Sequence, residues 1–163
     1  GDWSSDVCSS DLRPVRRAAP MKILFISADN TCRSLIAEGI CRWMDIEDVE
    51  CWSCGGRAGA GLHPLAKQVL EEIGVPTDDL KPKLISAVPA DSMDLLVTLC
   101  DEDFVPDLPP DLPWEHWPTD HPAAVKEDTP EKRLKRFRTH LNFPPYHNTT
   151  LTCFQRAYPA RCM

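Results

Sequence analysis

The residues that decide the fold run from Ile23 to Ser34 and read Ile23-Leu24-Phe25-Ile26-Ser27-Ala28-Asp29-Asn30-Thr31-Cys32-Arg33-Ser34. The first four are apolar, which is typical of a buried strand. After a polar loop, apolar residues recur from Arg33 at intervals of three and four, the pattern of an amphipathic helix. This order gathers backbone N–H groups and the positive end of a helix dipole beside a guanidinium able to make a two-pronged contact. The stretch therefore predicts a binding site for a tetrahedral dianion such as phosphate or arsenate.

The rest of the chain alternates between strand and helix patterns. Apolar runs predict strands at 22–27, 49–53, 94–100 and 115–117. Helices are expected from Arg33, from Pro64 with Gly74 as its C-terminal stop, and from Pro130 with Leu134, Phe137 and Leu141 on one face. We therefore predict an α/β fold, a three-layer sandwich with a four-stranded parallel sheet flanked by helices. Ligands of such sheets bind at the carboxyl ends of strands, where both the Ser27 loop and Cys100 are expected.

Length and charge limit the protein to a few classes. A chain of 163 residues with 42% hydrophobic residues predicts one ordinary core and one domain. The net charge of −7 argues against nucleic-acid binding. No apolar run approaches the length of a membrane span, and no apolar signal segment opens the chain. We expect a cytoplasmic protein without a membrane or nucleic-acid partner.

The two ends differ in composition from the middle. The Ser/Asp-rich residues 1–12 resemble a translated sequencing adapter, and 13–20 form a short basic lead-in before Met21. Turn-forming residues follow Phe143. We predict a domain at 21–143, a non-native or disordered leader at 1–20, and a disordered or artefactual tail at 144–163.

Five of the eight cysteines lie within the predicted domain: Cys32, Cys41, Cys51, Cys54 and Cys100. In a reducing compartment all five default to free thiols. Cys51 and Cys54 have CxxC spacing, but residues three apart on a strand face opposite sides, which disfavours a redox pair or a metal half-site. His63 and His116 are expected in surface or packing roles. We expect no metal and no cofactor.

The loop resembles the C-x5-R-S phosphate loop of the low-molecular-weight protein tyrosine phosphatases and the thioredoxin-coupled arsenate reductases, with Ser27 in place of the leading cysteine. Further motifs carry the resemblance along the chain, and the last two favour the arsenate reductase branch: Ser53-Cys54-Gly55, Gly61-Leu62-His63-Pro64, Val97-Thr98-Leu99-Cys100-Asp101, and His116-Trp117 with His121-Pro122. The resemblance implies anion binding by Ala28, Asp29, Asn30, Thr31, Cys32, Arg33 and Ser34. In that reading Arg33 binds the equatorial oxygens, Ser34 contacts the nucleophile position, and Asn30 braces the loop.

The same resemblance assigns catalytic positions to Ser27, Arg33, Cys100, Asp120 and His121, and three of its expected groups are replaced. Ser27 stands at the nucleophile position, where an alcohol is much harder to ionise than a thiol. Val105 aligns with the cysteine that relays a disulfide outward. His121 precedes Pro122, where the family has an acidic aspartate, with Asp120 one residue earlier. These departures predict a diverged relative that keeps the oxyanion loop but is catalytically impaired.

Other interpretations stay open. The chain could be an active phosphatase or arsenate reductase with a rearranged site using Cys32 and Cys100, a non-catalytic interaction module, or an enzyme altered at one position by design or sequence error. The expected partners are phosphate, arsenate or sulfate, together with thioredoxin or a phosphoprotein.

Overall fold

The computed structural model describes residues 20–57, 59–99, 110–117, 120–123 and 129–141. The predicted tail and nearly all of the predicted leader lie outside these residues, as do Cys100 and Val105. In chain order the elements are β1 (Met21–Ser27), α2 (Arg33–Trp43), β2 (Val49–Gly55), α3 (Pro64–Glu72), the 3₁₀ helices η1 (Ile85–Ala87) and η2 (Ala90–Ser92), β3 (Leu95–Thr98), β4 (Trp114–His116) and α4 (Pro130–Leu141).

These elements confirm the predicted alternation. The second strand is two residues longer than predicted and ends at Gly55. Gly74 follows α3 with a φ of +87°, a left-handed conformation that glycine adopts without steric cost, and so it ends the helix as expected. None of the helices in the described part of the chain is long and apolar enough to cross a membrane.

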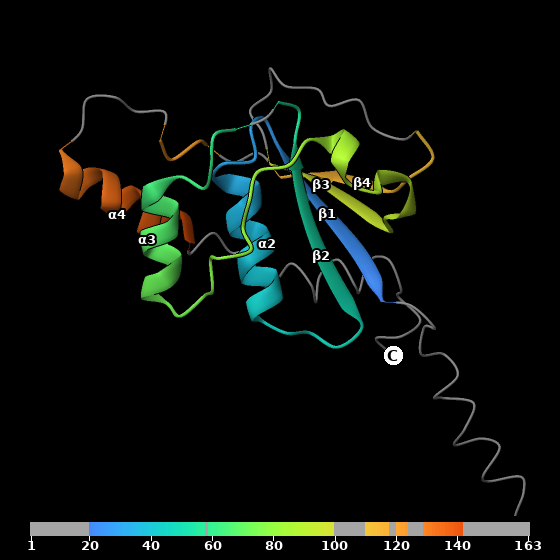
Figure 1. The fold of residues 1–163 in the computed structure, drawn as a ribbon, viewed down its shortest axis with the longest axis horizontal. Helices are drawn as coiled ribbons and strands as arrows, with labels where there is room; N and C mark the ends of the chain where they lie inside the picture. Colours follow the sequence, from blue (N-terminus) through green and yellow to red (C-terminus); the bar gives the residue numbers. More distant parts are fainter. Residues whose placement is uncertain (1–19, 58, 100–109, 118–119, 124–128, 142–163) are drawn as a thin grey trace, which may run out of the picture.

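The four strands form one parallel sheet in the order β2-β1-β3-β4 (Figure 1). Its register pairs Ser27 with Gly55 and Ile26 with Thr98. The carboxyl ends of the three longest strands therefore lie side by side at one end of the sheet, where β1 passes into the loop before α2. The four-stranded parallel α/β fold predicted from the sequence is confirmed.

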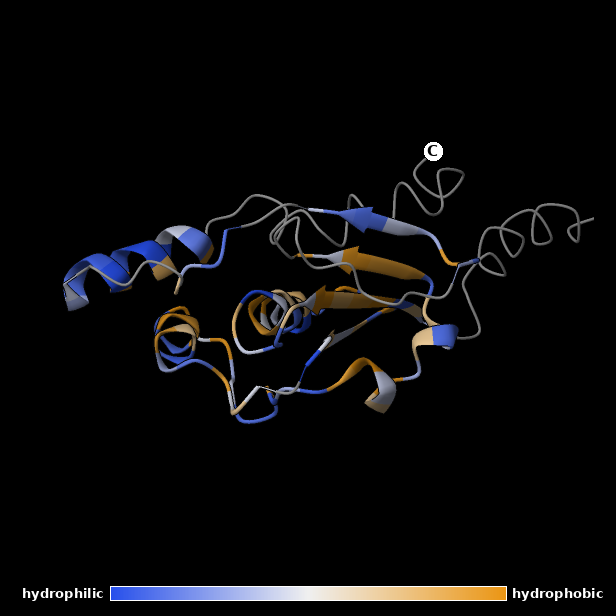
Figure 2. Cartoon of the chain, turned by 90° about the horizontal axis from the view of Figure 1, so that it is seen from above, coloured by the Kyte–Doolittle hydropathy of each residue, from blue (hydrophilic) through white to orange (hydrophobic). Residues whose placement is uncertain are grey.

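Each face of the sheet has its own apolar cluster. On one face, β1 and β2 pack against α2, with α3 and α4 beyond it, around buried side chains such as Phe25, Ile40 and Phe137. On the other face, Leu24 and Leu96 pack with Val88 and Met93 from the segment that carries η1 and η2. Figure 2 shows the apolar central strands β1 and β3, with the more polar β4 at the sheet edge.

Two of the five cysteines correct the prediction of free thiols, because Cys41 and Cys51 form a disulfide between α2 and β2. Both lie on surfaces that pack together, a contact between elements that no local pattern of the sequence reveals. Cys32 and Cys54 are free, as predicted, and both are buried. Cys51 and Cys54 belong to the clusters on opposite faces of the sheet, as their spacing on a strand predicts.

Candidate functional site

The site begins where the central strand ends. β1 stops at Ser27, and α2 starts at Arg33, so the intervening loop lies against the N-terminus of that helix. Asn30 has a φ of +54°, in the left-handed region that asparagine tolerates better than most residues. The loop passes so close to β2 that a Cβ at Gly55 would lie 2.8 Å from the backbone nitrogen of Asn30. Only glycine fits at position 55 without displacing the loop.

Two serine hydroxyls face each other across this loop. Ser27 Oγ lies 2.6 Å from Ser34 Oγ, and both side chains are buried. Asn30 Nδ2 donates to Ser34 Oγ at 2.6 Å. Because Ser34 Oγ accepts that proton, its own proton is available to Ser27 Oγ. The arrangement directs a hydrogen-bond donor toward position 27 and would stabilise negative charge there.

Asn30 ties the loop to three separate parts of the fold. Besides its bond to Ser34 on α2, its Nδ2 donates to Ser53 Oγ on β2 at 3.0 Å. Its Oδ1 accepts from the backbone nitrogen of Lys83 at 2.8 Å, which holds the segment before η1. The carbonyl of Thr31 also accepts from the backbone nitrogen of His63 at 2.8 Å. These bonds fix the loop from both sides.

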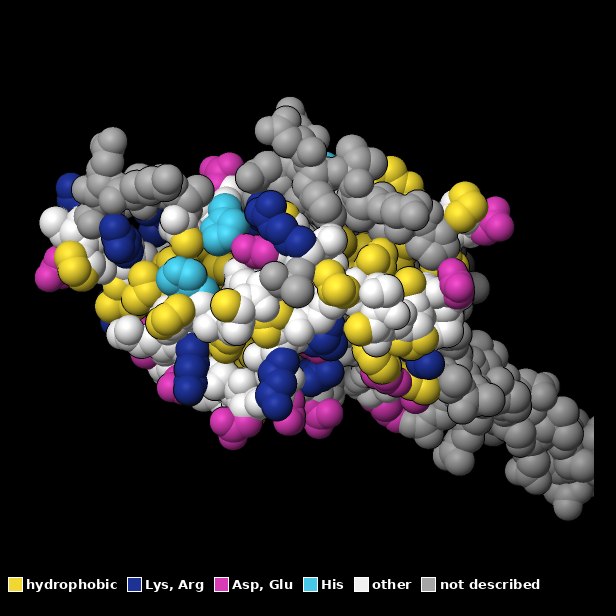
Figure 3. Space-filling view, turned by 45° about the horizontal axis from the view of Figure 1, so that its top comes forward, with side chains coloured by type: hydrophobic (Ala, Val, Ile, Leu, Met, Phe, Trp, Pro, Cys, Tyr) yellow, Lys and Arg dark blue, Asp and Glu magenta, His cyan; other side chains and the backbone are white. Residues whose placement is uncertain are grey.

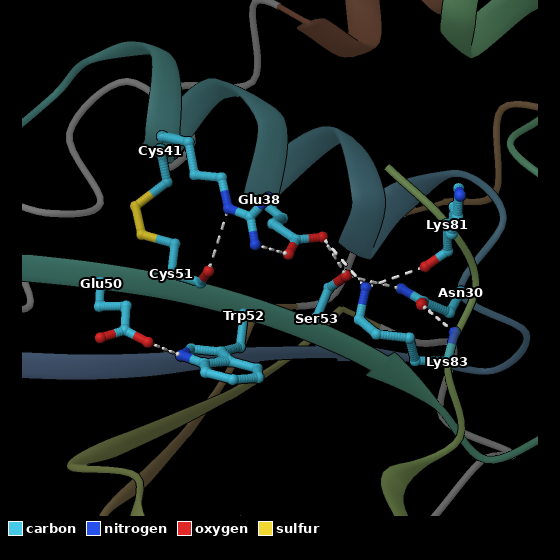
Figure 4. Close-up of polar contacts among 10 residues, drawn as sticks. Asn30, Glu38, Cys41, Glu50, Cys51, Trp52, Ser53, Lys81 and Lys83 are labelled. Atoms are coloured by element: carbon cyan, nitrogen blue, oxygen red, sulfur yellow. Dashed lines mark hydrogen bonds and ion pairs between the residues drawn. A yellow bond between two sulfur atoms is a disulfide. The ribbon is translucent and has the colours of Figure 1, made fainter. Parts of the chain in front are cut away.

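A buried carboxylate between α2 and β2 supports this arrangement. Glu38 on α2 is fully buried, and its Oε2 accepts from Ser53 Oγ at 2.6 Å. Arg42 Nη2 lies 2.7 Å from Glu38 Oε1, and Lys83 Nζ lies 3.5 Å from Oε2. Figure 4 shows these groups between α2 and β2. The carboxylate thus has a hydroxyl donor and two cations, the combination that makes a buried charge tolerable.

Sequence reasoning did not single out Glu38 or Lys83. Glu38 had a usable signal, because it is an acidic residue between the buried apolar residues Ala37 and Ile40 on a helix that packs against the sheet. Lys83 had none, since its contact with Asn30 joins residues 53 positions apart.

His140 is influenced by the charges of both Arg33 and His121. Arg33 is 2% exposed in the first turn of α2. Burial first, and then the charges of Arg33 and His121, lower the pKa of His140 to about 4. His140 belongs to the last turn of α4, so the charges that act on it come from the first turn of α2 and from the segment after β4. No sequence pattern singles out His140. Figure 3 shows histidine, basic and acidic side chains close together on one face of the molecule.

His63 connects α3 with α4. Its Nδ1 accepts from the backbone nitrogen of Leu65 at 3.1 Å and caps the N-terminus of α3. Its ring stacks on Phe137 with centroids 4.9 Å apart. Burial lowers the pKa of His63, with Asp29 raising it and Arg133 lowering it further. This packing role agrees with the sequence-based expectation.

The other residues considered from the sequence differ in how far they are exposed to solvent. Asp120 is exposed, and His121 is half-buried with its Nδ1 accepting from the backbone nitrogen of Ala123 at 3.1 Å. Cys32 is fully buried, and burial, partly offset by Arg33, raises its thiol pKa. Burial also raises the pKa of Cys54 to about 12. The described residues contain no cluster of three side chains able to hold a metal ion.

The comparisons with known proteins agree with one another. Residues 22–106 match the family model described as low molecular weight phosphotyrosine protein phosphatase. "Arsenate reductase 1" of Staphylococcus haemolyticus is 33% identical over 128 residues, covering 73% of this chain and 96% of that protein. "Arsenate reductase" of Bacillus subtilis is 33% identical over 112 residues, covering 68% of this chain and 80% of that protein.

Solved structures share the fold. An arsenate reductase in the phosphate binding state superposes with a TM-score of 0.64 at 24% identity, covering 84% of this chain and 98% of that one. The arsenate reductase of Archaeoglobus fulgidus superposes with a TM-score of 0.59 at 29% identity, covering 73% of this chain and 94% of that one. The chain therefore belongs to the low molecular weight phosphotyrosine protein phosphatase family, and its similarities lie with the arsenate reductase branch of that family.

Proposed function

We propose that this chain binds a tetrahedral oxyanion, phosphate or arsenate, in the loop from Ser27 to Ser34, and that it is catalytically impaired. The observation that carries the proposal is the contact of Asn30 with Ser34 and of Ser34 with Ser27, each at 2.6 Å, beside the N-terminus of α2. The shared fold with the solved structure of an arsenate reductase in the phosphate binding state supports it.

The groups around the loop suit a dianion. Arg33 offers a guanidinium fork that matches two oxygens of a tetrahedral anion. The first-turn N–H groups of α2 and the positive end of its dipole favour negative charge at the same point. Sulfate, phosphate and arsenate share this shape and charge, and a phosphoprotein presents the same tetrahedral group.

The impairment follows from the chemistry of Ser27. Reduction of arsenate to arsenite takes two electrons, which thiols supply by becoming a disulfide and an alcohol does not. As a nucleophile, the serine also lacks an adjacent base among its described hydrogen-bond partners, because Ser34 is an alcohol. Cys32 does not replace it, since burial raises the pKa of its thiol. From the sequence we also expect a dithiol protein such as thioredoxin as a partner, and a cytoplasmic location. Both are part of this proposal.

The test is the thermal shift and binding affinity of the protein with sulfate, phosphate and arsenate. Arg33→Ala is expected to abolish the shift, and Arg33→Lys to weaken it, because lysine keeps the charge but loses the fork. Lys67→Ala is the control: Lys67 has a side chain 56% exposed on α3, and its replacement changes the net charge equally. If Arg33→Ala leaves the shift unchanged, or Lys67→Ala abolishes it too, the loop is not the binding site.

A further inference from the structure

We propose that Cys41 and Cys51 are a redox modification site, a thiol pair whose oxidation fixes α2 against β2. This cross-link stiffens the proposed anion-binding loop of residues 27–34, called the anion loop below. Its effect on anion affinity rests on the proposed function, whereas the cross-link and its effect on the loop do not. None of the catalytic positions assigned above is part of this pair.

The disulfide joins the same two elements that hold the loop support. Cys41 lies on α2 and Cys51 on β2, and each is 3% exposed. Glu38 lies about one helical turn before Cys41, and Ser53 lies on the same strand two residues after Cys51. The 2.6 Å hydrogen bond from Ser53 to Glu38 is therefore the next link between α2 and β2 in the direction of the loop (Figure 4).

Arg42 contacts groups at both the disulfide and the Ser53–Glu38 hydrogen bond. Its Nη2 lies 2.7 Å from Glu38 Oε1, and its Nε donates to the carbonyl of Cys51 at 3.4 Å. The guanidinium thus contacts the backbone of one disulfide partner and the buried carboxylate together. A shift of α2 along β2 changes the contact between Arg42 and the Cys51 carbonyl, and the Cys41–Cys51 disulfide is a covalent bond that opposes such a shift.

The support ends at the anion loop. Ser53 Oγ donates to Glu38 and accepts from Asn30 Nδ2 at 3.0 Å, and the same Asn30 nitrogen donates to Ser34 Oγ at 2.6 Å. Short hydrogen bonds tolerate little change in distance before they weaken. The position of Ser53 relative to Glu38 therefore sets how firmly Asn30 holds the loop, and the disulfide restricts that position.

The chemistry needs only common reagents. Hydrogen peroxide oxidises the two thiols to one disulfide and is reduced to two molecules of water, a transfer of two electrons and two protons. A dithiol reverses the reaction: one of its thiolates attacks a sulfur of the disulfide, and its second thiol resolves the mixed disulfide, leaving two cysteine thiols and an oxidised dithiol. Because both sulfurs are buried, exchange requires local opening between α2 and β2, which makes each state persistent.

The first experiment locates the cross-link and its effect on the loop. The full chain is treated with peroxide or with dithiothreitol, alkylated in denaturant, and mapped by mass spectrometry. We expect a Cys41–Cys51 peptide after peroxide and two alkylated cysteines after dithiothreitol, with slower hydrogen exchange of residues 27–34 in the oxidised protein. Cys41→Ala/Cys51→Ala is the control, in which exchange of these residues is the same after both treatments. Alkylation of both cysteines after peroxide, or equal exchange in the two wild-type states, overturns the proposal.

The second experiment separates this inference from the proposed function. We expect the oxidised protein to bind sulfate about fivefold more tightly than the reduced protein, the lower end of typical coupling between two sites. The double alanine variant is expected to lose that difference. If both wild-type states bind sulfate equally and Arg33→Ala removes binding, the coupling is wrong and the anion site stands. If neither state binds sulfate, the proposed function fails, and the exchange rates alone decide on the cross-link.

Discussion

Ser53 Oγ lies 2.6 Å from the carboxylate of Glu38, and through Asn30 this contact links a buried charge on α2 to the anion loop. A hydroxyl has one proton, and Ser53 uses that proton to donate a hydrogen bond to Glu38. Its lone pairs are thereby oriented toward Asn30 Nδ2. The direction of donation along the series is therefore fixed by the charge of Glu38.

Removal of that charge is the first test of the support. Glu38→Gln is expected to lower the free energy of unfolding by about 1–3 kcal/mol, because Arg42 and Lys83 lose their buried counter-charge. Glu38→Ala is expected to cost about 3–5 kcal/mol, the range for removing one partner of a buried pair. Urea denaturation measures both. Glu131→Gln, an exposed position on α4, should stay within about 0.5 kcal/mol; an equally small effect at Glu38 would contradict this account.

Two substitutions separate the backbone of Asn30 from its side chain. Asn30→Gly keeps the positive φ and loses three hydrogen bonds, and we expect a loss of about 1–3 kcal/mol in unfolding free energy together with weaker sulfate binding. Asn30→Ala loses the same bonds and adds about 1 kcal/mol of strain, because alanine is disfavoured at this φ. Equal stability of the two variants in denaturant titrations would show that the loop relaxes out of the left-handed conformation.

Restoring a thiol tests whether the loop is still prepared for chemistry. Ser27→Cys places sulfur beside Ser34 and the N-terminus of α2. If the proposed anion site is correct, the pKa of this thiol should fall below the usual value of about 8.5. We expect rapid alkylation below neutral pH and partial phosphatase activity toward aryl phosphates, raised further by His121→Asp. Arsenate reduction is expected to stop after a single turnover, because the family resemblance of the sequence aligns Val105 with the relay cysteine.

The matched control for this rescue is Ser27→Cys combined with Arg33→Ala, which should alkylate more slowly and show no phosphatase activity. Cys32 should stay unreactive in both variants, because burial raises the pKa of its thiol. Slow alkylation of the introduced thiol in the Ser27→Cys variant would mean that the loop no longer favours an anion at that position.

His140 gives a pH dependence with a definite sign. Its pKa in the folded protein is lowered to about 4 from an ordinary 6.5, so the unfolded chain takes up the proton first. The stability associated with neutral His140 is present above about pH 6.5 and is lost as the pH falls from 6.5 to 4, by up to roughly 3 kcal/mol. Urea denaturation at several pH values should show a shallower loss for His140→Gln than for the wild type. Sulfate should also reduce the wild-type loss, because an anion beside Arg33 offsets the repulsion of protonated His140. An unchanged slope in His140→Gln would refute the assignment.

The sequence predicts the fold well because the information needed is local. The apolar runs of β1 and β3, the helical spacing from Arg33, and Gly74 after α3 each depend on neighbouring residues. It also predicts the anion loop, since strand, loop and helix are consecutive. The support for that loop is different, because it depends on contacts between Asn30, Ser53 and Lys83, which only the tertiary fold brings together. The Cys41–Cys51 disulfide was missed for the same reason.

The bond from the Lys83 nitrogen to Asn30 Oδ1 also bears on how the protein is made, because it joins residues 53 positions apart. A ribosome finishes the loop long before it adds the residue that completes its support. β1 further needs β3, whose residue Leu95 pairs with Ile23, before its second edge is covered. Contacts of such sequence separation slow folding, since the chain must close long loops first. A nascent chain that ends before Lys83 would carry every residue of the anion loop and still lack the completed site, so maturation is set by the later part of the domain.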